Sequence, residues 1–145
     1  RSELPDVLAS QCRQADLQRD PLLKAVGKQK KGLTVTDATA GFAHDSLRMA
    51  AAGLRVTALE RDPVLHAFVS GGLSALQEHD DTRQLFHQRI ADAGGSLELR
   101  LTDAVDYFQA SAQQGHHSDI VYLDPMFPSA KRKSALPKRR MQWLR

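Results

Sequence analysis

The feature that most constrains the fold is an alternation of short apolar runs with amphipathic stretches between residues 33 and 123. Runs rich in β-branched or alternating apolar residues predict strands, and the stretches between them have helical spacing. The predicted strands are 33–36, 55–59, 97–101 and 120–123. Strands that alternate with helices form a parallel sheet with right-handed crossovers and helices on both faces. The sequence therefore predicts an α/β fold.

Capping residues give the predicted helices their boundaries. Asp45 can cap a helix that ends near Gly53, and Asp62-Pro63 places a cap before proline at the first helical position. Gly71-Gly72 is expected to interrupt or end that second helix. Further helices are predicted over 82–90 and 104–112, and a helical segment over 1–32 precedes the first strand. The continuously apolar strand 120–123 is expected in the buried middle of the sheet.

Ligands of parallel α/β sheets bind at the carboxyl ends of the strands, so the residues directly after each strand are candidates. The first such turn, Asp37-Ala38-Thr39-Ala40-Gly41, consists of small residues that let the backbone approach a ligand. Only one of the three glycines of a dinucleotide fingerprint is present. Asp37 and Asp45 would repel a phosphate but suit an ammonium group, which favours S-adenosylmethionine over a dinucleotide. The alternative is an ordinary tight strand-to-helix turn.

Two further turns carry groups that suit an adenosine. Glu60 ends the second strand 23 residues after Asp37, where a carboxylate accepts hydrogen bonds from ribose hydroxyls in either class of cofactor. Thr102-Asp103 follows the third strand and can accept the adenine amino group. Asp103 is equally suited to cap the next helix, and both roles can hold at once.

The last turn, Asp124-Pro125-Met126-Phe127, follows the fourth strand. Asp124 offers an acceptor for an exocyclic amine, and Pro125 stiffens the backbone. Phe127 offers a flat face on which a nucleobase can stack. The alternative is a turn with a buried phenylalanine.

The charge is divided along the chain. All 17 acidic residues precede residue 131, whereas seven of the 20 Lys and Arg residues lie in the last fifteen positions. Such a basic arm either meets an anion, usually nucleic acid, or is a solvated surface segment. The arm residues considered for RNA are Lys131, Arg132, Lys133, Lys138, Arg139 and Arg140.

These motifs resemble a known family. Asp124-Pro-Met-Phe127 is similar to the (Asn/Asp)-Pro-Pro-(Tyr/Phe/Trp) motif of amino-directed, S-adenosylmethionine-dependent methyltransferases, with Met126 in place of the second proline. More specifically, the chain resembles the RsmJ family from residue 24 to about residue 141. The matching segments are 24–27, 37–41, 59–61, 121–128 and 133–136.

The resemblance implies a Rossmann-like class I methyltransferase fold, with a parallel sheet that is truncated after the fourth strand. It implies an S-adenosylmethionine-binding core over 33–128 and a basic arm over 129–145 that leads to missing strands. The implied reaction is methyl transfer to the N2 amine of a guanine in small-subunit (16S) ribosomal RNA, with the RNA or the 30S subunit as partner and the cytoplasm as location.

The resemblance also implies roles for individual residues. The implied catalytic residues are Asp124, Pro125 and Phe127. The implied cofactor-binding residues are Asp37, Ala38, Thr39, Gly41, His44, Asp45, Glu60, Arg61, Thr102, Asp103 and Asp124. His44 departs from the family, which usually has arginine before Asp45.

Two other functions remain open on the residues alone: a nucleotide-binding oxidoreductase and an RNA-binding module without catalysis. The missing glycines argue against the first, and the intact Asp124 and Phe127 argue against the second. No membrane partner is expected, because no apolar run approaches the roughly 18 residues of a spanning helix. No metal is expected, because the single cysteine, Cys12, excludes an all-cysteine site. The sequence leaves the oligomeric state open.

Overall fold

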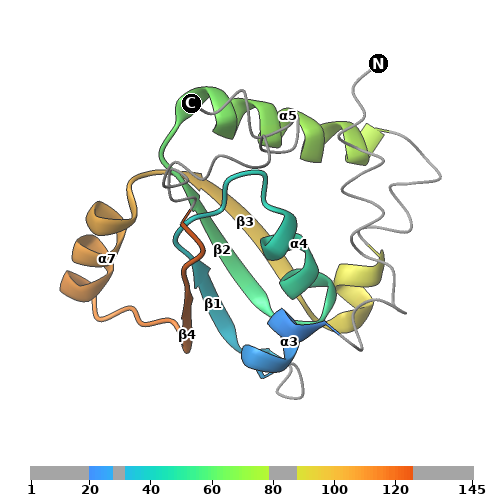
Figure 1. Ribbon diagram of the computed structural model, residues 1–145, viewed down its shortest axis with the longest axis horizontal. Helices are drawn as coiled ribbons and strands as arrows, with labels where there is room; N and C mark the ends of the chain where they lie inside the picture. Colours follow the sequence, from blue (N-terminus) through green and yellow to red (C-terminus); the bar gives the residue numbers. More distant parts are fainter. Residues whose placement is uncertain (1–19, 28–31, 79–87, 126–145) are drawn as a thin grey trace, which may run out of the picture.

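A computed structural model describes residues 20–27, 32–78 and 88–125, and these form a parallel sheet with helices on both faces (Figure 1). The strands are β1 (Thr34–Asp37), β2 (Arg55–Glu60), β3 (Ser96–Leu101) and β4 (Ile120–Tyr122). Their order in the sheet is β3-β2-β1-β4, and all neighbours pair in parallel. The predicted α/β fold is confirmed.

The sheet separates two layers of helices. The main hydrophobic core joins β1 and β2 to α3 (Pro21–Ala25) and α4 (His44–Ala51). A smaller core joins Ala43 to α5 (Pro63–Glu78) through Leu65 and Val69. α7 (Ala104–Gln113) lies at the opposite face. Leu99 faces the core, so the next residue of β3, Arg100, points to the other face. Its guanidinium stands 5.6 Å from the centroid of the Tyr107 ring of α7.

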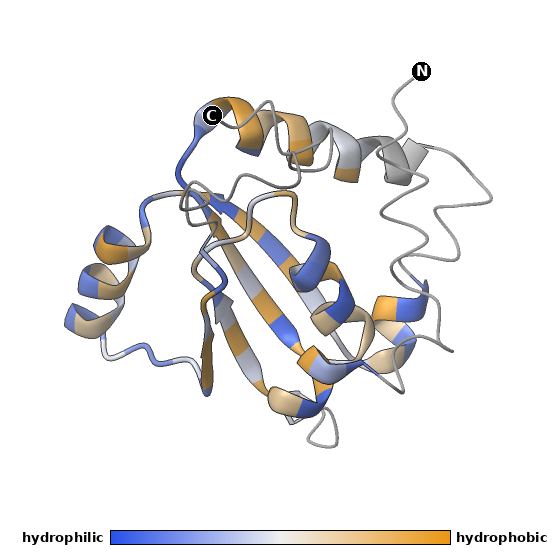
Figure 2. Cartoon of the chain, viewed as in Figure 1, coloured by the Kyte–Doolittle hydropathy of each residue, from blue (hydrophilic) through white to orange (hydrophobic). Residues whose placement is uncertain are grey.

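Residue alternation along the strands explains why one face carries the core. Val35 and Val56 are paired across the sheet and almost fully buried, and Leu97 continues the row onto β3. The intervening positions of β1 and β3 are polar or charged. Figure 2 shows this alternation of apolar and polar residues along the strands. Successive side chains of a strand point to opposite faces, so one row packs against α3 and α4.

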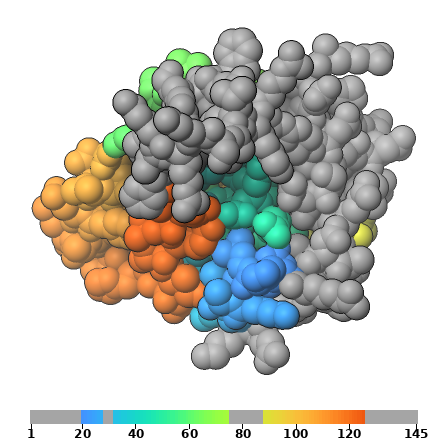
Figure 3. Space-filling view, viewed as in Figure 1, coloured from blue at the N-terminus to red at the C-terminus, as the bar shows by residue number. Residues whose placement is uncertain are grey.

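Within the described residues, the structure does not place 120–123 in the buried middle of the sheet, as the sequence predicts. Among the described residues β4 pairs only with β1, and it therefore forms an edge of the sheet. Val121 and Leu123 are 49% and 63% exposed, and the orange segment that ends at residue 125 lies on the surface in Figure 3. An apolar run of this length is typical of a buried strand, but the pairing partners decide its place.

Two helix predictions are also wrong. α4 begins at His44 after Ala43, which adopts a left-handed conformation with φ 57°, so Asp45 lies in the first turn and is not the cap. α5 continues through Gly71-Gly72 to Glu78. A glycine in a helix costs about 1 kcal/mol, and packing of Leu65, Val69 and Leu73 along one side of α5 offsets that cost.

Other helix predictions agree with the structure. Asp62 accepts the Val64 and Leu65 amides at the start of α5, which confirms its predicted capping role. At the start of α3, Asp20 accepts the Leu22 amide in the same way. The predicted helix over 82–90 lies partly outside the described residues, and the structure has a helix at 88–93, three residues past the predicted end. Within the described ranges, none of the helices has the length and apolar character needed to span a membrane.

Candidate active site

The four turns predicted to bind ligands lie together at the carboxyl ends of the parallel strands. The parallel hydrogen-bond ladder continues past the strands: the Ala38 amide donates to the Tyr122 carbonyl at 3.0 Å and the Ala40 amide to the Leu59 carbonyl at 3.1 Å. The Thr102 amide donates to the Glu60 carbonyl at 3.0 Å. These backbone bonds hold the turns after β1, β2, β3 and β4 side by side.

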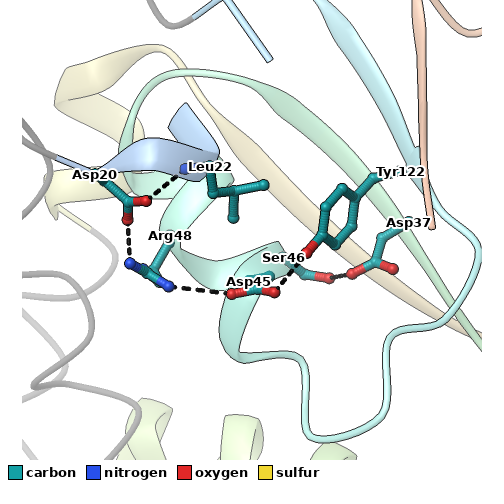
Figure 4. A network of polar contacts seen from close by, with 7 residues as sticks. All are labelled: Asp20, Leu22, Asp37, Asp45, Ser46, Arg48 and Tyr122. Carbon is teal, nitrogen blue, oxygen red and sulfur yellow. Dashed lines mark hydrogen bonds and ion pairs between the residues drawn. The ribbon is translucent and has the colours of Figure 1, made fainter. Parts of the chain in front are cut away.

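Asp37 is the buried anchor of the first turn, with 1% of its surface exposed. Its Oδ1 accepts the Thr39 amide at 3.0 Å, and its Oδ2 accepts the Ser46 hydroxyl at 2.5 Å (Figure 4). Burial raises the pKa of the Asp37 carboxyl, the two hydrogen bonds oppose that rise, and the negative charges of Asp45 and Asp124 add to it. The three carboxylates therefore share a region of negative potential.

The backbone of the first turn is unusual. Gly41 has φ 53°, a conformation that suits glycine, and Ala43 has φ 57° although it carries a side chain. The Ala43 methyl is fully buried in the small core with Leu65 and Val69, and this packing holds the residue in its strained conformation. The turn is thereby fixed at the entry to α4.

Glu60 links the first turn to the turn after β2. Its Oε2 accepts the Gly41 amide at 3.0 Å and its Oε1 accepts the Asp62 amide at 2.8 Å. A carboxylate has about four acceptor positions, so these two bonds leave capacity for ribose hydroxyls. Glu60 at the end of β2 is therefore held against the first turn.

The turn after β3 lies beside the turn after β2. The Arg61 guanidinium stands 3.8 Å from the Asp103 carboxylate, in an exposed pair of little energetic weight. Asp103 caps α7 by accepting the Val105 amide at 2.8 Å, which confirms the capping role predicted for it. The Thr102 hydroxyl donates to the Asp103 carbonyl at 3.2 Å.

The turn after β4 is tied to the first turn at two points. The Asp124 amide donates to the Thr39 hydroxyl at 2.8 Å, and the Tyr122 hydroxyl donates to the Asp45 carboxylate at 2.8 Å. Burial and the bond to Asp45 raise the pKa of Tyr122, so the phenol keeps its proton. Asp124 and Pro125 are exposed residues at this end of the sheet.

A chain of charges extends from this edge into the N-terminal layer. Asp45 accepts a hydrogen bond from Arg48 at 3.2 Å, and Arg48 also forms an ion pair with Asp20 (Figure 4). Sequence reasoning missed Arg48, Asp20, Ser46 and Tyr122. The spacing of three between Asp45 and Arg48 is typical of a helical ion pair and was the one local signal available.

The remaining predicted residues are placed as follows. His44 is half-buried as the first residue of α4, and its ring stacks on Phe42 with centroids 6.1 Å apart. Phe127 and the six basic arm residues lie outside the described residues, as do the boundaries predicted near 128. In the part of the chain that the structure describes, no three His, Cys, Asp or Glu side chains are grouped to hold a metal ion.

Comparison with known families accounts for this arrangement. Residues 6–145 match the SAM_MT family, described as "Putative SAM-dependent methyltransferase". The chain belongs to this family. S-adenosylmethionine is the cofactor on which the family name rests, and the described residues fit it. The neighbouring carboxylates of Asp37, Asp45 and Asp124 suit its sulfonium and ammonium charges, and Arg48, which pairs with Asp45, is also paired with Asp20.

Individual relatives within the family carry a more specific name. "Ribosomal RNA small subunit methyltransferase J" of Tolumonas auensis is 39% identical over 122 residues, which are 83% of this chain and 45% of the relative. The protein of the same name from Legionella pneumophila (strain Lens) is 37% identical over 132 residues, or 91% of this chain and 49% of the relative. The chain thus spans about half the length of the curated relatives it matches.

A solved structure supports the fold. The crystal structure of an SAM-dependent methyltransferase from Neisseria gonorrhoeae is 33% identical and superposes with a TM-score of 0.64. The superposition covers 85% of this chain and 47% of the other. The Rossmann-like methyltransferase fold expected from the sequence is therefore confirmed.

Proposed function

We propose that this chain carries the S-adenosylmethionine site and the substrate turn of a methyltransferase that modifies the N2 amine of a guanine in small-subunit ribosomal RNA, in the cytoplasm. The observation that carries the proposal is the bond between the Asp124 amide and the Thr39 hydroxyl. It supports the proposal because it joins Asp124, the acceptor we propose for an exocyclic amine, to the turn whose carboxylates suit the cofactor. The curated name of the relatives supports ribosomal RNA as the substrate.

The proposed cofactor-binding residues have different roles, which follow from their charge and their position. S-adenosylmethionine supplies a methyl group on a positively charged sulfur, which is already activated for transfer. Asp37 and Asp45 compensate positive charge, and Glu60 accepts ribose hydroxyls. Ala38, Thr39 and Gly41 let the backbone approach the ligand, with His44 at the start of α4. Arg61, Thr102 and Asp103 line the adenine side.

Asp124 acts on the nucleobase. The lone pair of a guanine amine is delocalised into the ring, which makes the nitrogen a weak nucleophile. The exposed Asp124 carboxylate accepts a hydrogen bond from this amine and favours a more tetrahedral nitrogen. Positioning supplies much of the rate, and the surplus proton passes from the methylated nitrogen to water after transfer. Asp124 therefore orients the amine and need not be a strong base.

The nucleobase has to leave its stack to reach this edge. Phe127 offers a stacking face worth about 1–3 kcal/mol, and Pro125 limits the freedom of the turn. We assign 1–32 to an N-terminal segment, 33–128 to the cofactor-binding core and 129–145 to a basic arm that leads to further strands. Lys131, Arg132, Lys133, Lys138, Arg139 and Arg140 contact RNA phosphates, which adds salt dependence without base specificity.

Calorimetric titration tests the cofactor, with S-adenosylhomocysteine as the probe and NADH as the control. Binding of S-adenosylhomocysteine alone is expected, and binding of NADH alone would overturn the proposal in favour of an oxidoreductase. Transfer of labelled methyl groups to small-subunit RNA tests the reaction. Asp124→Ala should abolish transfer and leave S-adenosylhomocysteine binding largely intact, whereas Asp92→Ala, at an exposed position in helix 88–93, should change neither. Full transfer by Asp124→Ala would refute the role of Asp124.

A further inference from the structure

Thr39 occupies a junction between the two halves of the proposed site. Its amide donates to Asp37 at 3.0 Å, and its hydroxyl accepts the Asp124 amide at 2.8 Å. Asp37 is in turn fixed by the Ser46 hydroxyl of α4 at 2.5 Å. A continuous path of hydrogen bonds therefore runs from the buried face of α4 through Asp37 and Thr39 to the backbone of the substrate turn.

The Thr39 hydroxyl accepts a backbone amide that has no strand partner among the described residues. β4 ends at Tyr122, and the backbone ladder between β1 and β4 has its last contact in the bond from the Ala38 amide to the Tyr122 carbonyl. Asp124 lies two residues farther and is exposed. Its amide is attached through the side chain of Thr39, which sets where the Asp124 carboxylate stands relative to the first turn.

A matched bond joins the same two strands at the opposite end. The Thr34 hydroxyl and amide both donate to the Asp119 carboxylate, at 2.6 and 2.8 Å. Thr34 begins β1 and Asp119 directly precedes β4, so this link lies away from the candidate site. Two threonines five residues apart therefore make comparable links. Thr39 holds the turn after β4 at the candidate site, and Thr34 holds the start of β4 at the other end of the sheet.

We propose that Thr39 is a positioning residue for methyl transfer, which couples the cofactor turn to the Asp124 turn through its hydroxyl. The inference rests on the proposed function and assigns the Thr39 side chain to the substrate half of the site. Binding of the cofactor at the first turn then fixes the Asp124 amide as well. Loss of the hydroxyl lets the Asp124 turn move, and a displacement of about 1 Å at a reacting centre can cost roughly a hundredfold in rate.

The first test does not depend on activity. Nuclear magnetic resonance of the full chain reports hydrogen exchange at the Asp124 amide and its chemical shift as S-adenosylhomocysteine is added. Thr39→Val should lower the protection of this amide about fivefold, the factor that corresponds to one ordinary hydrogen bond. It should also remove most of the shift caused by S-adenosylhomocysteine. Thr39→Ser keeps the hydroxyl and should restore both.

The second test separates turnover from binding. For Thr39→Val we expect kcat to fall by about tenfold to a hundredfold, while KM for S-adenosylmethionine changes by less than about threefold. Thr39→Ser should recover most of kcat. Thr34→Val cuts the far link between β1 and β4, and we expect it to lower stability with kcat unchanged.

The outcomes distinguish the two proposals. If the wild-type chain binds S-adenosylhomocysteine but transfers no methyl group to RNA, the proposed function fails, and the Asp124 amide still decides whether Thr39 couples the turns. If Thr39→Val keeps the amide protected and responsive to S-adenosylhomocysteine, the coupling is wrong. A loss of kcat that is equal in Thr39→Val and Thr34→Val, or that Thr39→Ser does not rescue, also overturns it.

Discussion

Arg48→Met tests the charged network that links α3 to α4. The substitution keeps the apolar stem of the side chain and removes the guanidinium that pairs with both Asp20 and Asp45. The Asp20 side chain is 1% exposed, whereas that of Arg48 is 30% exposed. Without Arg48, the Asp20 carboxylate stays buried and loses its cationic partner. It keeps the hydrogen bond that it accepts from the Leu22 amide.

The size of the effect follows from this burial. Removing one partner of a fully buried ion pair costs about 3–5 kcal/mol, because the other charge is left uncompensated. Water already reaches part of the Arg48 guanidinium, so we expect a smaller loss, about 2–3 kcal/mol in the free energy of unfolding.

A second substitution identifies the cause. Asp20→Asn removes the negative charge and keeps an acceptor for the Leu22 amide, since asparagine caps helices as well as aspartate does. The double variant Asp20→Asn/Arg48→Met should therefore lie within about 1 kcal/mol of the wild type. The two substitutions then differ from additivity by about 2 kcal/mol, a coupling typical of residues in direct contact.

Urea unfolding followed by far-UV circular dichroism measures the four proteins of this cycle. The reasoning fails if Arg48→Met alone lies within 0.5 kcal/mol of the wild type, on the order of a neutral surface substitution. It fails equally if the double variant is as unstable as the sum of the single ones, because Asp20 would then not be the source of the cost.

Four further predictions concern packing and pH. Gly95→Ala would place a Cβ 2.0 Å from the Ala50 carbonyl oxygen, so we expect a loss of at least about 1–3 kcal/mol in urea unfolding. Gly71→Ala, in α5 with nothing within 4 Å, should instead gain about 0.5–1 kcal/mol. Hydrogen bonds from Thr34 lower the pKa of Asp119, so its contribution is complete above the unfolded pKa near 4 and lost as the pH falls through the folded value. Asp119→Asn should therefore flatten the acid side of a stability–pH curve. Burial raises the pKa of Asp37, so its contribution runs the other way and stability falls as the pH rises from about 4 through the folded value. Asp37→Asn should abolish that fall in the same measurement.

Local chemistry made much of the fold predictable. The residues around Asp62 and Asp103 predict that both cap helices, and both accept the amides that a cap has to satisfy. The helix at Asp45 was misplaced because the chain turns at Ala43 in a conformation that a residue with a side chain rarely adopts. Only the packing of Ala43 against Leu65 and Val69 explains that choice, and this packing is not visible in local sequence.

The candidate site was predictable as a set of turns but not as a set of bonds. The rule that ligands bind at the carboxyl ends of parallel strands selected Asp37, Glu60 and Asp124. The partners of these residues come from elsewhere: Tyr122 meets Asp45 across 77 residues and Asp124 meets Thr39 across 85. Spacing in one sequence carries no information on such pairs, because they depend on strand order.

The strand order also has a consequence for the time at which the site forms. β1 is made early in synthesis, but its neighbours are β2 and β4, and β4 is the last of the four strands to leave the ribosome. Contacts across 85 residues close slowly, because the chain entropy of the intervening loop is lost before the contact forms. We expect β1, β2 and β3 to associate first, and cofactor affinity to arise only when β4 docks beside β1.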